Sequence, residues 1–314
     1  MAHAQDRPVV LRFAGDLLLA GNYEIAADTN AGLAFKDFTL LRDADVAMVN
    51  LECPVTDRGT KVEKPYNFRM RPSYVGAIKD AGIDIVNLAN NHIFDYGEVG
   101  FFDTISILDS AGIMHVGAGR NKQAAHRPVV LVLQGRRFAF LGYYAGGEAP
   151  GATADSPGVA RRAVQSIAND IQRARADDSA DVVIITLHWG EEKAEYPEPK
   201  YVRFGHAAID AGADLIIGHH PHVLQGVERY KRGVIVYSLG NFIFGGNARH
   251  TYDTALFEAA FSRDSVSYRF IPIGVRQWQA STLSGQDSAS VVEILRKRSE
   301  MFKETIEYTS KEQE

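Results

Sequence analysis

The chain has 314 residues, of which 46% are hydrophobic, so it is long enough for one large domain or two small ones with a substantial core. The formal net charge is -5 and the basic residues are scattered, which disfavours nucleic acid as a partner. The single cysteine, Cys53, excludes an internal disulfide framework, and no uncharged apolar stretch reaches the length of about 18 residues typical of a membrane-spanning helix.

The first half of the chain alternates between strand and helix patterns. Two strands are predicted within residues 129–142, on either side of a turn at Gln134 and Gly135. The earlier strands are predicted at residues 9–16, 45–52, 83–91 and 113–119, and the helices at residues 74–81 and 98–110. Such alternation is typical of an α/β fold.

The middle of the chain contains a loop and two apolar strands. Residues 146–158 are rich in Gly, Pro and Ser, and this composition predicts a long surface loop, with a lid as one interpretation. The continuous apolar run at residues 182–187 is typical of a central strand buried on both faces. A second apolar run, at residues 213–217, leads directly into the sequence GHHPHV.

The last part of the chain adds a hairpin and a terminal helix. Residues 255–275 alternate around Arg263 and Asp264 as an antiparallel hairpin, so we expect mixed or doubled sheets. After Ser288 the pattern predicts an amphipathic helix whose end frays. Its apolar positions are Val291, Leu295, Phe302 and Ile306.

Side chains suited to metal binding follow five of the predicted strands. Because parallel strands present their carboxyl ends at one edge of a sheet, we expect these side chains to gather there. A mixed set of oxygen and nitrogen donors fits a two-metal hydrolytic centre, with ions about 3.5–4 Å apart. It suits Mn, Fe or Zn better than Ca or Mg. The residues are Asp16, Asn50, Glu52, Asn90, Asn91, His92, His188, His219, His220 and His222.

The chain also resembles a known family. The segments FAGDLLLAG, NLECPVT, FRMRP, NLANNHIFDYG, HWGEE, GHHPHVLQGVE and YSLGNFIFG, which span about residues 9–246, resemble the CapA family of poly-γ-glutamate capsule synthesis proteins. The resemblance implies a calcineurin-like metallophosphatase fold, which is a four-layer αββα sandwich with mixed sheets. We expect this domain to cover residues 1–280. Residues 281–314 would form a C-terminal amphipathic helix, packed on the domain or partly frayed.

The resemblance implies a role for each matching residue. Glu52 stands where the wider superfamily has its bridging aspartate, and Asn91 is expected to ligate the second metal. His92 would donate a proton to the leaving group or contact the transferred group. The residues implied as metal ligands are Asp16, Glu52, Asn91, His188, His220 and His222.

One donor of the superfamily pattern is missing. The first motif of the superfamily is Asp-x-His, whereas this chain has Leu18 two residues after Asp16. One metal position therefore lacks a ligand, and the centre is expected to hold either one ion or two. His219 has no counterpart in the pattern. It packs, hydrogen-bonds to a ligand, or substitutes for the missing donor.

Three further residues are candidates for the site. Arg69 would clamp a phosphate or carboxylate with its guanidinium, or it is a solvated arginine at an edge. Asp95 would orient His92, and Asn241 would line the pocket; for each, an ordinary role in a loop is the alternative.

The leading hypothesis is a metal-dependent hydrolase of the CapA type that acts on a phosphoester or related electrophile, with His92 assisting the leaving group. The resemblance suggests an anionic substrate, either phosphorylated or γ-glutamyl, and polymer-synthesis proteins as partners. One alternative is a γ-glutamyl amidohydrolase or transferase that uses the same metals. Another is a non-catalytic, metal-binding accessory subunit of a polymer synthase. As the sequence stands we expect a soluble, cytoplasmic protein, or the soluble part of an anchored one.

Overall fold

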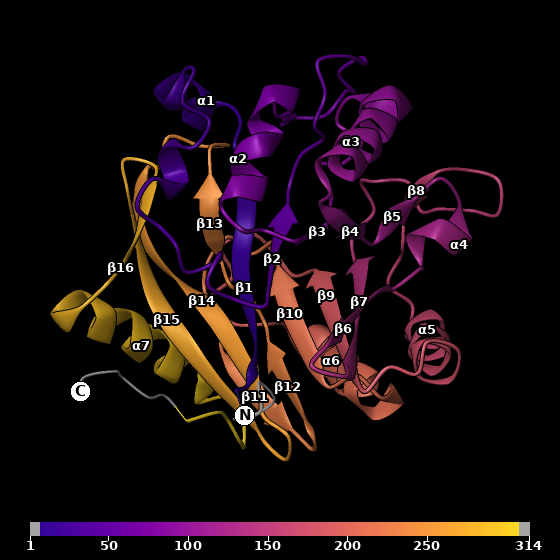
Figure 1. Ribbon diagram of the computed structural model, residues 1–314, viewed down its shortest axis with the longest axis vertical. Coiled ribbons are helices and arrows are strands. Elements are labelled where there is room, and N and C mark those ends of the chain that lie inside the picture. The colour runs from indigo at the N-terminus through magenta and orange to yellow at the C-terminus, as the bar shows by residue number, and fades with distance from the viewer. Residues whose placement is uncertain (1–6, 308–314) are drawn as a thin grey trace, which may run out of the picture.

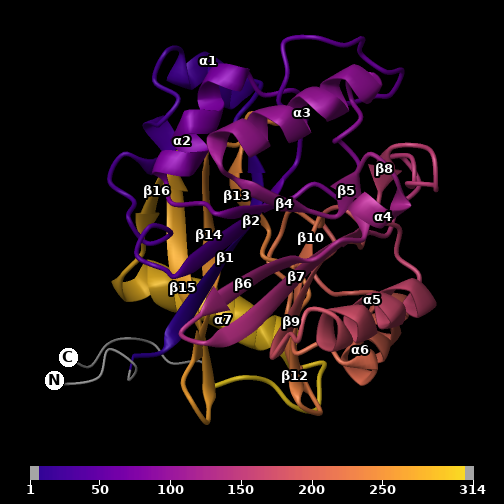
Figure 2. The ribbon, with the colours of Figure 1, turned by 45° about the vertical axis from the view of Figure 1, so that its right-hand side comes forward.

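A computed structural model describes residues 7–307. It contains two large β-sheets, and Figures 1 and 2 show helices on their outer sides. The first sheet comprises β1 (Val9–Leu18), β2 (Val46–Leu51), β3 (Ile85–Asn87), β4 (Met114–Val116), β13 (Asn241–Phe244), β14 (Thr251–Phe261), β15 (Val266–Arg276) and β16 (Gln279–Thr282). The second sheet comprises β6 (Val129–Leu133), β7 (Arg136–Tyr144), β9 (Val182–His188), β10 (Leu215–His219), β11 (Val227–Tyr230) and β12 (Gly233–Val236).

Seven α-helices lie within the described residues 7–307. They are α1 (Asn22–Ala27), α2 (Val75–Asp80), α3 (Gly97–Ala111), α4 (Lys122–Ala125), α5 (Val164–Ala176), α6 (Pro199–Ala211) and α7 (Gly285–Ser299). A small two-stranded sheet pairs β5 (Ala118–Gly119) with β8 (Gly158–Val159). Among the described helices, none is both long enough and apolar enough to cross a membrane.

Both large sheets are mixed, as the sequence predicted. In the first sheet β1, β2, β3 and β4 run parallel, and β14 joins β1 antiparallel and begins the hairpin with β15. In the second sheet β7, β9, β10 and β12 run parallel, while β6 and β11 pair antiparallel at its edges. The parallel strands of each sheet place several carboxyl ends side by side.

The side-chain pattern of β9 explains the layered architecture. Ile184 lies in the apolar core between the two sheets, with Phe13 and Phe257 of the first sheet. Its neighbour Ile185 points to the other face, where it packs against α5 and α6. Because successive side chains of a strand alternate between faces, a strand that is apolar throughout has to be covered on both sides.

The outer face of the first sheet has its own apolar core. Val49 of β2 packs there with residues of α1, α2 and α3, including Tyr23, Ile78 and Phe101. Figure 1 shows these three helices at the top of the molecule and α5 and α6 at its lower right. The order of layers is therefore helix, sheet, sheet, helix, and the predicted αββα fold is confirmed.

The C-terminal helix is shorter than the sequence pattern predicts. α7 ends at Ser299, so the prediction of a helix continuing through Phe302 and Ile306 is wrong. The chain then turns and runs beside β11, where Arg229 N donates to the Glu304 carbonyl oxygen at 3.0 Å. Val291, Leu295 and Ile306 all pack into the core between the sheets, so the apolar positions are buried although the helix has ended. The sequence also predicted that the end of this helix frays. That prediction includes residues 308–314, which lie outside the described part of the chain.

Candidate metal centre and adjoining cavity

The carboxyl ends of strands from both sheets meet at one place. Asp16 lies near the end of β1, Glu52 follows β2, and His188 is the last residue of β9. The register of β9 and β10 places His219 opposite His188. All four side chains have at most 1% of their surface exposed. The fold thus gathers polar groups that are far apart in the sequence into a buried cluster.

Glu52 belongs to two groups of donor atoms in this cluster. The first group is Glu52, His188 and His220, and the second is Asp16, Glu52 and His222. Within each group, one ligand atom from each residue lies within 4.8 Å of the others. A carboxylate common to two such groups could contact two metal ions at once.

Asn91 joins the first group. Its Oδ1 lies 2.9 Å from His188 Nε2, and the side chain is 7% exposed. The loop that carries it begins where β3 stops at Asn87, earlier than predicted. Asn87 Oδ1 accepts a hydrogen bond from Ala89 N at 3.2 Å, and Asn90 Oδ1 accepts one from His92 N at 3.1 Å. Such local side-chain bonds compete with strand pairing and end the strand.

Asn50 holds the two carboxylates together. Its Nδ2 lies 2.8 Å from Asp16 Oδ1 and 3.1 Å from Glu52 Oε2. Its Oδ1 in turn accepts hydrogen bonds from Asn87 and Asn90. This amide network fixes the spacing of the acidic groups.

Burial and close contacts shift the pKa values of the groups in this cluster. Burial and the neighbouring Asp16 raise the pKa of Glu52 well above its usual value. Burial raises the pKa of Asp16 too, but contacts with His219 and His222 outweigh burial and hold it well below its usual value. Burial and the nearby His220 lower the pKa of His188, which favours the neutral imidazole that binds metals.

Three buried atoms of the cluster that could bind a metal have no hydrogen-bond partner. They are Glu52 Oε1, His219 Nδ1 and His220 Nδ1. An unsatisfied buried polar atom costs about 1–3 kcal/mol, so a cluster of them requires compensation. Carboxylate oxygens and neutral imidazoles are the donors that divalent transition metals prefer. The residues present therefore fit a divalent metal.

The backbone around the histidines is strained. His220 and His222 have φ values of 97° and 58°, which non-glycine residues adopt at a cost of about 1–3 kcal/mol each. Pro221 stands between them and restricts the backbone. On the opposite side, Asp16 N donates to the Gly240 carbonyl oxygen at 2.9 Å, and a Cβ at Gly15 would lie 1.9 Å from that oxygen. Only glycine permits this approach, which brings Asp16 to the cluster.

His92 lies beside the cluster in a separate network. Its Nδ1 is 2.7 Å from Asp95 Oδ2, which also accepts a hydrogen bond from Phe68 N at 2.7 Å. The Lys64 ammonium forms an ion pair with Asp95 and donates to the Asn91 carbonyl oxygen at 2.8 Å. Burial lowers the pKa of His92, although Asp95 opposes this effect.

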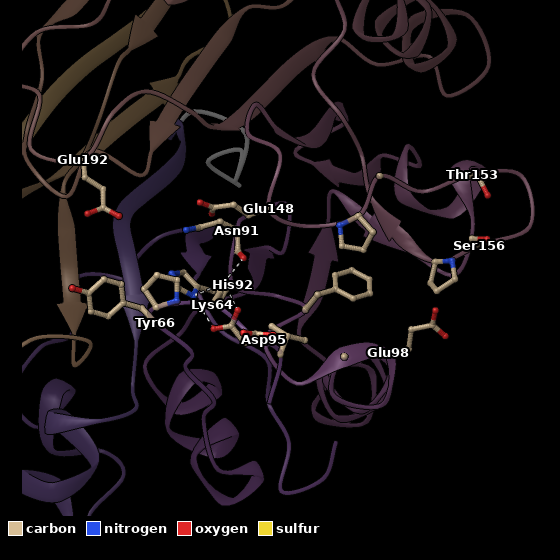
Figure 3. A pocket seen from close by; sticks show the side chains of 18 residues that line it. Lys64, Tyr66, Asn91, His92, Asp95, Glu98, Glu148, Thr153, Ser156 and Glu192 are labelled. Carbon is tan, nitrogen blue, oxygen red and sulfur yellow. Dashed lines mark hydrogen bonds and ion pairs between the residues drawn. The ribbon is translucent and has the colours of Figure 1, made fainter. Parts of the chain in front are cut away.

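A cavity of about 960 Å³ opens beside Asn91, His92 and Asp95 (Figure 3). The predicted loop at 146–158 forms part of its wall, and the Arg161 side chain binds the Gly146 and Ala149 carbonyl oxygens of this loop. Among the described residues that line the cavity, Lys64 is the single lysine or arginine. The carboxylates in the lining are Glu63, Asp95, Glu98, Glu148 and Glu192.

The structure places the remaining candidates in different surroundings. Asn241 Oδ1 lies 2.8 Å from His222 Nδ1, so Asn241 contacts the cluster. Arg69 does not join it: the Arg69 side chain is exposed and its guanidinium lies 4.6 Å from the centre of the Tyr96 ring. The sequence analysis assigned a role to Asp95 but missed Lys64 and four cavity carboxylates, Glu63, Glu98, Glu148 and Glu192, because none of them directly follows a predicted strand.

A two-sheet αββα sandwich with this donor cluster at its strand ends defines the class of calcineurin-like metallophosphatase folds. Haemophilus influenzae NAD nucleotidase (NadN) has a similar structure, with a TM-score of 0.52 and 11% sequence identity over 96% of this chain and 57% of that one. Residues 10–246 match the family described as bacterial capsule synthesis protein PGA_cap, and the chain belongs to this family.

Several curated relatives align over most of the chain. Capsule biosynthesis protein CapA of Bacillus anthracis is 35% identical over 270 residues, which cover 82% of this chain and 64% of that protein. PGA biosynthesis protein CapA of Bacillus subtilis (strain 168) is 30% identical, over 84% of this chain and 71% of the relative. A probable polyglutamine synthesis accessory protein of Mycobacterium tuberculosis is 31% identical, over 78% of this chain and 70% of that protein. The aligned region thus spans less than two thirds of the B. anthracis protein.

Proposed function

We propose that this protein is a metal-dependent hydrolase with a dinuclear centre that acts in the synthesis of a poly-γ-glutamate type of polymer. The observation that carries the proposal is the sharing of Glu52 between two groups of buried donors. In this proposal Asp16, Glu52 and His222 would hold one ion, and Glu52, Asn91, His188 and His220 would hold the other. Mn, Fe and Zn are the candidate metals, because the donors are nitrogen and oxygen atoms.

The protein groups around the centre have distinct tasks in this proposal. Divalent ions would supply Lewis acidity and an activated water. Asn50 keeps Asp16 and Glu52 at a fixed spacing through its Nδ2 contacts of 2.8 and 3.1 Å. The strained backbone at His220 and His222 keeps both imidazoles directed to the cluster.

His92 is the proposed proton donor to the leaving group. The Asp95 carboxylate accepts from Nδ1–H, so Nε2 of the same ring carries a proton for the leaving group only when His92 is an imidazolium. Burial lowers the pKa of His92, and the hydrogen bond to Asp95 opposes this effect and favours the imidazolium. Lys64 neutralises Asp95 and contacts the loop at Asn91, so it positions the pair. Since Asn91 and His92 both line the cavity, a substrate there would reach His92 and the one proposed metal ligand in the cavity wall.

The charge of the cavity limits the substrates that fit this proposal. Five carboxylates and one lysine line it, so a long polyanion along its whole length would be repelled. A substrate with one reacting anionic group, either a phosphoester or a γ-glutamyl unit, would place that group at the metals. The cations would compensate its charge there.

Two alternatives remain distinct from this proposal. A γ-glutamyl amidohydrolase or transferase would use the same ligands to polarise an amide carbonyl. A non-catalytic, metal-binding subunit that serves polymer-synthesis proteins is supported by the name of the M. tuberculosis relative, which is an accessory protein.

One experiment separates these functions. Protein loaded with Mn, Fe or Zn is incubated with a panel of phosphoesters and with γ-glutamyl oligomers, and the products are identified by mass spectrometry. Release of phosphate that is abolished in Glu52→Gln supports the phosphoesterase. Cleavage of the oligomers alone supports the amidohydrolase, and turnover of neither by fully metal-loaded protein supports the accessory role.

A further inference from the structure

We infer that Phe68 is a positioning residue for His92, which it holds in place relative to the metal cluster through Phe244. This inference rests on the proposed function, in which His92 donates a proton to the leaving group. The centroids of the Phe68 and His92 rings lie 4.7 Å apart, with an angle of 51° between the ring planes. Phe68 N donates to Asp95 Oδ2 at 2.7 Å, and the same oxygen lies 2.7 Å from His92 Nδ1. Phe68 therefore contacts both members of the His92–Asp95 pair.

The hydrogen bond to Asp95 does not fix the imidazole of His92 by itself. It fixes the position of one ring atom, and the ring can still turn about the axis of that bond. A second ring packed against the imidazole removes this freedom and so determines where Nε2 points. Proton donation requires Nε2 to be within hydrogen-bond reach of the leaving group, so the orientation of the ring affects turnover.

Phe244 connects Phe68 to the metal cluster. Its ring packs edge-on against Phe68, with centroids 6.1 Å apart and an angle of 76°, and its centroid lies 4.5 Å from that of His222. Phe244 is 5% exposed, and its position opposite Leu18 in the β1–β13 pair anchors it to the strand that carries Asp16. The four rings thus form a continuous series from the proposed proton donor to a proposed metal ligand.

The chain closes tightly over these two phenylalanines at Gly246. A Cβ at this position would lie 2.7 Å from Phe244 Cε1 and 2.9 Å from Phe68 Cζ, which is closer than side chains permit. Such close packing limits the motion of both rings. Neither phenylalanine is among the described residues that line the cavity. Phe68 therefore acts on a substrate in the cavity through His92.

The competing role for Phe68 is ordinary packing, because it also contacts the apolar core on the outer face of the first sheet. Phe38→Leu is the matched control: Phe38 belongs to that core, and its ring packs against Phe242, 5.7 Å away, instead of His92. Replacing either Phe68 or Phe38 by leucine removes an aromatic contact from the same core and keeps the position apolar. Loss of packing alone should therefore affect the two variants alike.

Two phosphoesters with different leaving groups separate these roles. The 4-nitrophenolate of 4-nitrophenyl phosphate leaves without a proton, whereas the ethoxide of ethyl phosphate has to be protonated. We expect Phe68→Leu to lower kcat for ethyl phosphate more than about 10-fold, since a positioned proton donor contributes about 100–10,000-fold. Its kcat for 4-nitrophenyl phosphate and its metal content should stay close to the wild type. Phe38→Leu should resemble the wild type with both esters.

A second measurement needs neither metal nor substrate. The imidazole N–H proton of His92 that faces Asp95 is observed by NMR in metal-free protein, and it is identified by its absence in His92→Gln. Because a held ring opens rarely, this proton should be protected from exchange with water in the wild type and in Phe38→Leu. In Phe68→Leu it should exchange several-fold faster.

Other results would overturn the inference. Equal losses of kcat for both esters in Phe68→Leu would leave Phe68 with a packing role alone. Unchanged N–H exchange in that variant would show that Asp95 holds His92 without Phe68. A wild type that hydrolyses neither ester would overturn the proposed phosphoesterase, and the NMR comparison would still decide whether Phe68 positions His92. Circular dichroism confirms that each variant is folded.

Discussion

His92 Nδ1 lies 2.7 Å from Asp95 Oδ2, three residues further along the same loop. Asp95 is fully buried, and its carboxylate also pairs with Lys64. A buried carboxylate shared by an imidazole and an ammonium fixes the ring orientation and determines which nitrogen faces the substrate.

Asp95→Asn should impair turnover without removing metal. The amide keeps the shape of the side chain but loses the charge that orients His92 and holds Lys64. If His92 is the proton donor, we expect kcat to fall about 100-fold or more. Steady-state kinetics on the substrate found by the panel above, with metal content as the control, provide the measurement. A kcat within twofold of the wild type would contradict the proposed role of the pair.

Glu52→Gln should empty or weaken both metal positions. Glu52 is common to both donor groups, and a neutral amide is a poorer ligand than a carboxylate. We expect elemental mass spectrometry to give at most one ion per chain where the wild type binds two. Glu98→Gln is the matched control, because Glu98 lines the cavity but lies outside both groups. Equal metal content in the two variants would disprove the bridging role.

Glu148→Gln should improve the binding of an anionic substrate. Glu148 adds negative charge to the cavity wall, so its removal reduces repulsion. We expect KM to fall several-fold at low ionic strength, and the difference to shrink near 1 M salt, where the Debye length is about 3 Å. Asp264→Asn makes the same charge change in the exposed turn between β14 and β15. If that control lowers KM equally, a local effect in the cavity is excluded.

Glu258 should make stability depend on pH. It accepts hydrogen bonds from Arg12 at 2.7 Å and from Arg269 at 2.5 Å. Burial raises the pKa of Glu258, but these two arginines outweigh burial and lower it overall. A lowered folded-state pKa contributes stability above the unfolded-state pKa, and this contribution is lost as pH falls through the folded-state value.

Urea unfolding of wild type and Glu258→Gln at several pH values tests this linkage. Near neutral pH the variant should be less stable by about 1.5–3 kcal/mol, which is typical for hydrogen bonds to a charged group. The difference should shrink on acidification, because the wild-type carboxyl is then protonated. A difference independent of pH would show that the carboxylate charge is not the cause.

Leu295→Ala should destabilise the whole domain. Leu295 of α7 is fully buried in the core between the sheets. Truncation of such a residue costs about 2–5 kcal/mol of unfolding free energy. The adjacent Ile294 is 40% exposed, so Ile294→Ala should change stability by less than about 0.5 kcal/mol. Similar small effects in both variants would mean that α7 is not part of the cooperative core.

The sequence predicted the elements whose pattern is local. The uniformly apolar run of β9 and the alternation in the β14–β15 hairpin each specify a strand through their own side chains. Asp16 and Glu52 could be assigned to one edge because the parallel strands β1 and β2 end together, whereas His188 belongs to the second sheet and reaches them through the packing of the two sheets. α7 shows the limit of such patterns: its apolar spacing continues past Ser299, but the helix ends there and the following segment contacts β11 instead.

Tertiary structure decided which of these residues meet, since register and packing depend on contacts between distant segments. The sequence by itself determined a set of donors at strand ends. The fold alone made Glu52 common to two groups, placed the unpartnered nitrogen of His219 beside Asp16, and brought Lys64 to Asp95. It also left Arg69 over Tyr96, outside the cluster. A residue type specifies which chemistry a side chain can perform, whereas the packing of two sheets specifies which side chains perform it together.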